Sequence, residues 1–159
     1  MHRYGSANRE RSKDLAAGER LTSDRKIRVA VCDDHGTFRR GVVEMLSLAP
    51  DLEVVGEAAT HEEAVAAVTQ LSPDVVLLDL EMPGAMGADG SMGRMLSLPS
   101  PPSVVVFTMH DEPGMVGRFL SRGASGYVPK SADMDELVEA VRGASPAAPR
   151  AATRRAGGA

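Results

Sequence analysis

The sequence predicts an α/β fold, a doubly wound sheet of five parallel strands with helices on both faces. Two observations support this prediction. Short apolar runs alternate along residues 27–143 with segments whose apolar residues recur at helical spacing, the pattern of successive βαβ units. The runs also lack the apolar and polar alternation of half-exposed strands, so they suit parallel strands that helices bury on both faces.

The five strands are expected at these apolar runs. They occupy residues 27–32, 52–58, 75–79, 104–108 and 126–128. A helix between the first two strands is indicated by apolar side chains at helical spacing, namely Phe38, Val42, Met45, Leu46 and Ala49. The next helix has a clear start signal, because Thr60 and Glu63 form a capping-box pattern, and it extends through Leu71.

Three further helices are predicted in the C-terminal half of the domain. The segment 88–98 is expected to be short or frayed, because an interior glycine costs a helix about 1 kcal/mol relative to alanine. Three glycines fall in or beside it: Gly87, Gly90 and Gly93. A fourth helix contains Phe119 and Leu120 and ends at Gly123, and a last helix covers residues 133–142.

The composition is typical of a soluble globular protein, with 43% hydrophobic and 25% charged residues. No apolar run approaches the length of a membrane span and no signal peptide is evident, so we expect a cytoplasmic protein without a membrane partner. The one cysteine, Cys32, excludes an internal disulfide.

Charge is distributed unevenly along the chain. Residues 1–26 hold seven basic and four acidic side chains, and residues 144–159 hold three arginines and no acid. Residues 27–143 hold 8 basic and 18 acidic side chains, a net charge of −10. We expect a mobile leader, an acidic domain, and a linker or tail rich in Ala, Pro and Arg, in that order. The acidic domain should attract cations and is poorly suited to nucleic acid.

Polar side chains follow the predicted strands at their carboxyl ends, where doubly wound sheets bind ligands. They are Asp33, Asp34, Asp79, Thr108 and Lys130. Neighbouring carboxylates repel one another unless a cation lies between them, and oxygen ligands suit Mg²⁺. A carboxylate with Mg²⁺, a lysine and a hydroxyl fits phosphoryl transfer to an acid. Asp79 is the expected nucleophile, because it ends the central strand.

These motifs are specific in their order and spacing. The pair Asp33-Asp34, the segment LLDLEMPG, the FT at residue 108 and the segment GYVPK resemble the receiver domain of two-component response regulators, the CheY-like superfamily. The resemblance covers about residues 27–142, and IRVAVCDDHGTFRRGVVEML with DLEVVGEA is similar to the NarL/FixJ type. It implies the flavodoxin-like strand order 2-1-3-4-5 and a phosphorelay that regulates transcription.

The resemblance also implies a phosphoacceptor and a metal site. A sensor histidine kinase would phosphorylate Asp79. Mg²⁺ would be held by Asp33, Asp34, Asp79 and the backbone carbonyl of Glu81. A sensor histidine kinase is therefore the expected partner. A second copy of this chain, forming a homodimer, is another partner to test.

The same resemblance implies a switch. Lys130 would contact the phosphoryl group, Thr108 would move to hydrogen-bond it, and Tyr127 would follow by changing rotamer. Two residues depart from the NarL pattern, Gly36 where proline is common and Pro129 where an aliphatic residue usually precedes the lysine. Neither departure removes a reactive group.

The C-terminal part differs more from the NarL/FixJ type, whose members usually carry a DNA-binding helix-turn-helix. Only 16 residues follow Gly143, fewer than three helices need. DNA binding is therefore not assigned to this chain, unless an output domain is missing.

The motifs favour a signalling module over a metabolic enzyme. The main alternative is a Mg²⁺-dependent phosphohydrolase with an aspartyl-phosphate, of the haloacid-dehalogenase type, although those enzymes carry a D-x-D nucleophile on the first strand. The 3% aromatic content disfavours a flavodoxin-like flavin carrier. No G-x-x-x-x-G-K-[ST] motif is present, which excludes a P-loop nucleotidase.

Overall fold

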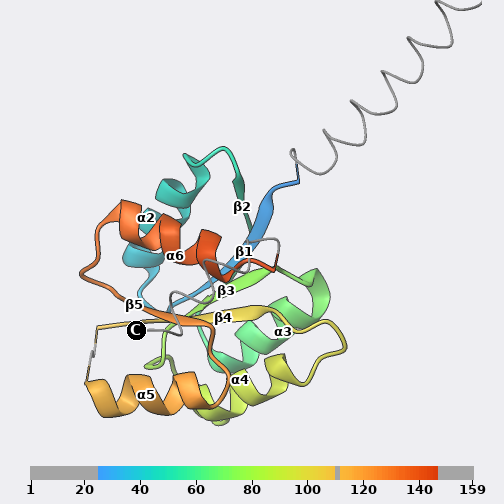
Figure 1. Ribbon diagram of the computed structural model, residues 1–159. Coiled ribbons are helices and arrows are strands. Elements are labelled where there is room, and N and C mark those ends of the chain that lie inside the picture. The colour runs from blue at the N-terminus through green and yellow to red at the C-terminus, as the bar shows by residue number, and fades with distance from the viewer. Residues whose placement is uncertain (1–24, 110–111, 147–159) are drawn as a thin grey trace, which may run out of the picture.

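The centre of the protein is a sheet of five parallel strands, seen in a computed structural model that describes residues 25–109 and 112–146. The strand order β2-β1-β3-β4-β5 confirms the predicted order (Figure 1). The strands are β1 (Ile27–Cys32), β2 (Leu52–Ala58), β3 (Val75–Leu78), β4 (Ser103–Thr108) and β5 (Gly126–Pro129). β2 lies on one side of β1 and β3 on the other, so the strand order changes direction at β1 and β3. Ligands of doubly wound folds bind beside such a point.

Helices cover both faces of the sheet, as Figure 1 shows. One face carries α2 (Gly36–Ser47) and α6 (Met134–Ala144). The other face carries α3 (His61–Leu71), α4 (Gly87–Leu96) and α5 (Pro113–Ser121). Across the part of the chain that the structure describes, no helix has the length and apolar character needed to cross a membrane.

The central strand β3 separates two apolar cores. Val76 and Leu78 belong to the core under α3, α4 and α5, whereas Val75 and Leu77 belong to the core under α2 and α6. All four side chains are fully buried. Burial of one such side chain contributes about 1.5–3 kcal/mol to folding. The strand that leads to Asp79 is therefore firmly held from both sides.

Two helices begin with side-chain caps that follow directly from the sequence. The hydroxyl of Thr60 accepts a hydrogen bond from the Glu63 N–H at 3.1 Å, and the Glu63 carboxylate accepts one from the Ala59 N–H at 2.9 Å. At α6, the Asp133 carboxylate accepts a hydrogen bond from the Glu136 N–H at 2.9 Å. Such caps satisfy N–H groups that have no partner within the helix.

The structure corrects the predicted burial of one strand. β2 is an edge strand with Glu53 and Glu57 exposed, so it is not buried on both faces as the sequence suggested. The apolar residues of this run suggested burial on both faces, but Glu53 and Glu57 within it and the order 2-1-3-4-5 that the resemblance implies both agree with an edge position.

Several element ends also differ from the prediction by one or two residues. β3 ends at Leu78, before Asp79, because the chain turns there into a loop. α4 is ten residues long and ends at Leu96, and α6 continues to Ala144. Despite its glycines α4 is a continuous helix, because Met92 and Met95 are buried against the core.

The predicted leader and tail fall mostly beyond the described residues. Of residues 1–26 the structure describes only 25 and 26, and of residues 144–159 it describes 144–146.

Candidate functional site

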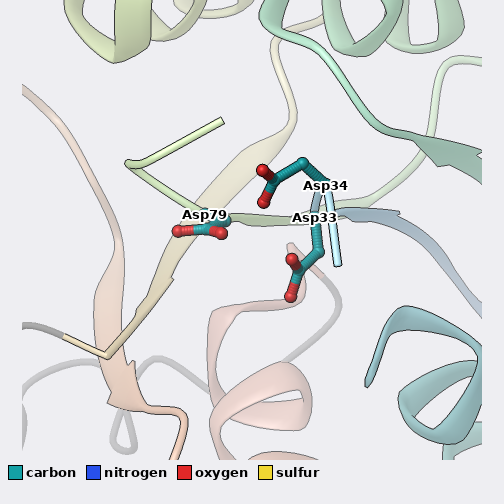
Figure 2. A group of neighbouring side chains, drawn as sticks. All are labelled: Asp33, Asp34 and Asp79. Atoms are coloured by element: carbon teal, nitrogen blue, oxygen red, sulfur yellow. The ribbon is translucent and has the colours of Figure 1, made fainter. Parts of the chain in front are cut away.

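The candidate site lies at the carboxyl ends of β1 and β3, where parallel pairing brings two acids side by side. Cys32 and Leu78 are register partners, so the residues that follow them, Asp33 and Asp79, leave the sheet together. The Asp79 N–H donates to the Cys32 carbonyl at 3.0 Å, which extends this pairing by one bond. Figure 2 shows the carboxylates of Asp33, Asp34 and Asp79 gathered at this edge of the sheet.

The three carboxylates form a compact oxygen cluster. One oxygen atom from each of Asp33, Asp34 and Asp79 lies within 4.8 Å of the others. Asp33 and Asp79 are buried, with 0% and 3% of their surface exposed, whereas Asp34 is exposed. Asp34 is therefore the member of the cluster most open to solvent.

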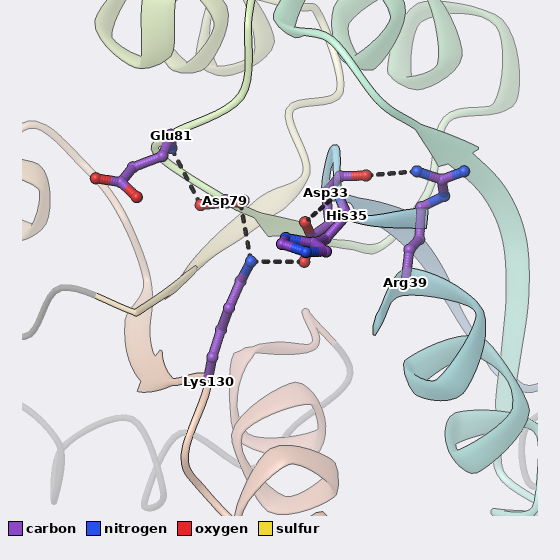
Figure 3. Close-up of polar contacts among 6 residues, drawn as sticks. All are labelled: Asp33, His35, Arg39, Asp79, Glu81 and Lys130. Carbon is purple, nitrogen blue, oxygen red and sulfur yellow. Dashed lines mark hydrogen bonds and ion pairs between the residues drawn. The ribbon is translucent and has the colours of Figure 1, made fainter. Parts of the chain in front are cut away.

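Short-range hydrogen bonds orient the two buried carboxylates. One oxygen of Asp79 accepts a hydrogen bond from the Glu81 N–H at 3.0 Å, and one oxygen of Asp33 accepts one from the His35 N–H at 2.9 Å (Figure 3). Each carboxylate is thus fixed by the turn that follows its strand, and its second oxygen faces Lys130.

Lys130 lies between the two buried acids. Its Nζ is 2.8 Å from Asp33 Oδ2 and 3.0 Å from Asp79 Oδ2, and Figure 3 shows the side chain reaching both from beyond β5. The Lys130 N–H donates to the Thr108 carbonyl at 2.9 Å, which fixes the start of the side chain. The Phe38 ring lies 5.1 Å from Nζ and shields the ammonium group. With 7% of its side chain exposed, Lys130 is not a solvated surface lysine.

The ionisation of the site follows from burial and these contacts. Burial raises the pKa of Asp79 above its ordinary value, and the hydrogen bonds from Glu81 and Lys130 offset this only in part. Burial by itself would lower the pKa of Lys130, but hydrogen bonds to Asp33 and Asp79 outweigh it, so that pKa is raised. Lys130 is therefore charged at pH 7. The ionised form of Asp79 is disfavoured by its burial, and a further positive charge nearby would stabilise it.

The two residues expected to form a switch lie on neighbouring strands. Thr108 is the last residue of β4 and is fully buried. Tyr127 on β5 is half-buried, packs against the core under α3, α4 and α5, and has a buried hydroxyl oxygen. In this structure Tyr127 therefore points into the protein.

Sequence reasoning missed two polar side chains near the site. Arg39 of α2 donates to the Asp33 carbonyl at 2.5 Å and pairs with Glu57 at 3.0 Å, so it ties the end of β1 to α2 and β2. His61 is fully buried at the start of α3, behind the loop that follows Asp79. Arg39 follows Asp34 by five positions on the predicted helix, a spacing from which its side chain can reach back to the end of the first strand. Nothing in the sequence marked His61 as buried.

Comparison with known proteins shows the family of this chain. The family model described as "Response regulator receiver domain" matches residues 29–142. The chain is 42% identical to the transcriptional regulatory protein NarL of Mycobacterium tuberculosis over 116 residues, 73% of this chain and 53% of that protein. It is 38% identical to the transcriptional regulatory protein DegU of Brevibacillus brevis over 120 residues, 76% of this chain and 50% of that protein.

Solved structures give the same result. The signal receiver domain of NarL from Mycobacterium tuberculosis superimposes with a TM-score of 0.69 at 41% identity, covering 74% of this chain and 94% of that one. The response regulator domain of Thermotoga maritima CheB gives a TM-score of 0.69 at 29% identity, covering 76% and 96%. The chain spans about half the length of the curated relatives it matches. It belongs to the response regulator receiver domain family, close to the NarL and DegU regulators of two-component systems.

Proposed function

We propose that this receiver accepts a phosphoryl group on Asp79 from a sensor histidine kinase and thereby changes a partner-binding surface in transcriptional regulation. One observation carries the proposal: the buried Asp79 carboxylate lies in a cluster of three acids and 3.0 Å from the Lys130 ammonium. A carboxylate with a structural role only has no need of two further acids beside it. A receiver domain of this family is not a classical enzyme, so the change in protein surface is its output.

The residues present suit an in-line transfer. An Asp79 oxygen would attack phosphorus, forming an O–P bond, while the P–N bond to the kinase histidine breaks and its electron pair stays on the imidazole. Lys130 is placed to follow the negative charge, because its Nζ already contacts the Asp79 oxygen that faces it. The Glu81 N–H holds the other Asp79 oxygen in place.

The donor set also fits Mg²⁺. Asp33, Asp34 and Asp79 supply closely spaced carboxylate oxygens, and burial raises the pKa of Asp79, a cost that a bound cation would offset. These acids and the backbone carbonyl of Glu81 would hold the ion, which when bound neutralises charge on the phosphoryl oxygens. Two of the acids are buried and one is exposed, which leaves an open side for water and phosphoryl oxygens.

Thr108 and Tyr127 are the proposed relay to the surface. Thr108 is buried at the strand end beside Asp79, and Tyr127 is half-buried on the next strand along. A phosphoryl group on Asp79 would draw the Thr108 hydroxyl toward it and open space that the Tyr127 ring can enter. Regulation of transcription is a proposal for the whole protein, based on the curated relatives. A homodimer is a further partner to test.

The test is phosphorylation by a small donor. Wild type and Asp79→Asn are incubated with Mg²⁺ and acetyl phosphate, and intact mass is followed. We expect one phosphoryl adduct on wild type and none on the variant, because an amide oxygen is not an effective nucleophile. No adduct on wild type, or equal labelling of Asp79→Asn, would contradict the proposal. Turnover of many phosphate esters per protein would point to a phosphohydrolase instead.

A further inference from the structure

His61 is an unusual residue at the start of α3, because its side chain is fully buried. Its Nδ1 lies 2.9 Å from the hydroxyl of Ser91, thirty positions away in α4. Ser91 is also fully buried and donates a hydrogen bond to the Ala88 carbonyl at 3.2 Å. The imidazole therefore links the first turn of α3 to the first turns of α4.

The same residue also contacts the loop after β3. The His61 N–H donates to the Pro83 carbonyl at 3.0 Å. Burial lowers the pKa of His61, and a backbone group of Leu80 opposes this effect only in part, so the ring is neutral at pH 7. Leu80 and Pro83 flank Glu81 and Met82 in the chain. The loop segment that would present the Glu81 carbonyl is thus held at Pro83 by the backbone of His61.

A neighbouring side chain holds the far end of the loop. The Glu62 carboxylate accepts a hydrogen bond from the Met86 N–H at 3.1 Å. The first turn of α3 therefore fixes the loop at Pro83 and at Met86, and fixes α4 at Ser91. Of these contacts, only the one to Ser91 depends on the imidazole itself, which makes it the contact that a substitution can isolate.

We propose that His61 is a positioning residue that, through Ser91, sets where the Glu81 carbonyl lies relative to Asp33 and Asp79. The inference rests on the proposed function, because that function assigns the Glu81 carbonyl to the Mg²⁺ site. The alternative is that His61 only fills space in the core. Space filling requires volume and no polar atom, whereas positioning requires the hydrogen bond to Ser91, so the two roles respond differently to chosen substitutions.

The test measures Mg²⁺ binding without any phosphodonor. Amide NMR shifts are followed during Mg²⁺ titration of the full chain for wild type, His61→Leu, His61→Asn and Ser91→Ala. Leucine keeps the volume and loses the hydrogen bond, while the asparagine amide can occupy the place of Nδ1. We expect Mg²⁺ binding to weaken about 10-fold in His61→Leu and Ser91→Ala, the effect of losing a supporting residue behind a metal ligand, and to be restored largely in His61→Asn.

A matched control separates positioning from stability. Val68 is buried in the same helix and the same core, seven positions after His61, so Val68→Ala should lower the melting temperature and leave Mg²⁺ affinity unchanged. Unchanged Mg²⁺ affinity in Ser91→Ala and His61→Leu, or equal weakening in Val68→Ala, overturns the inference. If His61→Leu does not fold, Ser91→Ala decides alone.

The outcomes also separate this inference from the proposed function. A wild type that binds Mg²⁺ but gains no phosphoryl adduct contradicts the function, and the titrations still decide the role of His61. A phosphorylated wild type whose His61 and Ser91 variants bind Mg²⁺ normally contradicts the positioning role alone. A wild type that binds no Mg²⁺ overturns the positioning role directly.

Discussion

At the scale of single residues, the site holds charges in an arrangement that does not favour folding. Asp79 is buried beside Asp33, and its raised pKa shows that the folded protein disfavours the carboxylate form relative to water. Lys130 compensates for part of this, since it pairs with both acids. A cation bound by these acids would offset the remaining cost, so the proposed binding capacity is obtained at the expense of stability.

The first prediction follows from the sign of that pKa shift. Without Mg²⁺, Asp79→Asn should raise the free energy of unfolding at pH 7 by about 1 kcal/mol, the usual gain from relieving a functional site. An acid with a raised pKa costs stability where it is ionised, so the gain should disappear as the pH falls through that pKa and below the ordinary value of 3.8.

Urea denaturation between pH 3.5 and pH 8 measures this effect. Glu44→Gln, which changes an exposed carboxylate on α2, is the control and should show no such pH dependence. A destabilised Asp79→Asn at pH 7 would show that the pairing with Lys130 outweighs burial.

At the scale of elements, the loop between β3 and α4 is the part of the fold most closely adapted to the site. Gly84 has φ of +136°, a conformation that other residues rarely adopt. The Glu62 carboxylate lies where a Cβ on Gly84 would stand. The loop passes this close to α3 because Glu62 must reach the Met86 N–H.

Gly84→Ala should therefore destabilise the protein by about 1–2 kcal/mol from backbone strain, and by more from the collision with Glu62. The urea midpoint of Gly84→Ala measures the total. The same substitution in a Glu62→Ala background removes the collision and should cost less. Equal cost in the two backgrounds would show that Glu62 is not displaced and that strain explains the whole effect.

At the scale of the whole molecule, metal binding and folding are linked, because the three acids come together only when β1 and β3 pair. A ligand that binds the folded state alone stabilises it, by about 1.4 kcal/mol at ten times its dissociation constant. Addition of Mg²⁺ should therefore raise the melting temperature of wild type.

Thermal denaturation followed by circular dichroism, with and without Mg²⁺, tests this linkage. NaCl at the same ionic strength controls for screening of the acidic surface, and Asp33→Asn should lose most of the shift, since it removes one of the clustered carboxylates. Equal shifts with Mg²⁺ and NaCl, or an undiminished shift in Asp33→Asn, would contradict a specific ion site.

The sequence by itself determined the fold class and most of the site. Apolar runs without polar alternation predict the strands, because only a sheet covered on both faces buries such runs. Since the strands are parallel, Asp33, Asp79 and Lys130 then lie at the same edge of the sheet. The cap at Thr60 was equally readable, since it depends on a contact between residues three positions apart. Such features are local, or follow from a rule that applies to all parallel sheets.

Only the tertiary structure decided the rest. α4 formed around its glycines because Met92 and Met95 are buried. The contact of His61 with Ser91 joins residues thirty positions apart, and that of Lys130 with Asp79 joins residues 51 apart. No periodicity records such pairs, because they depend on how the packed helices and loops place each side chain in space.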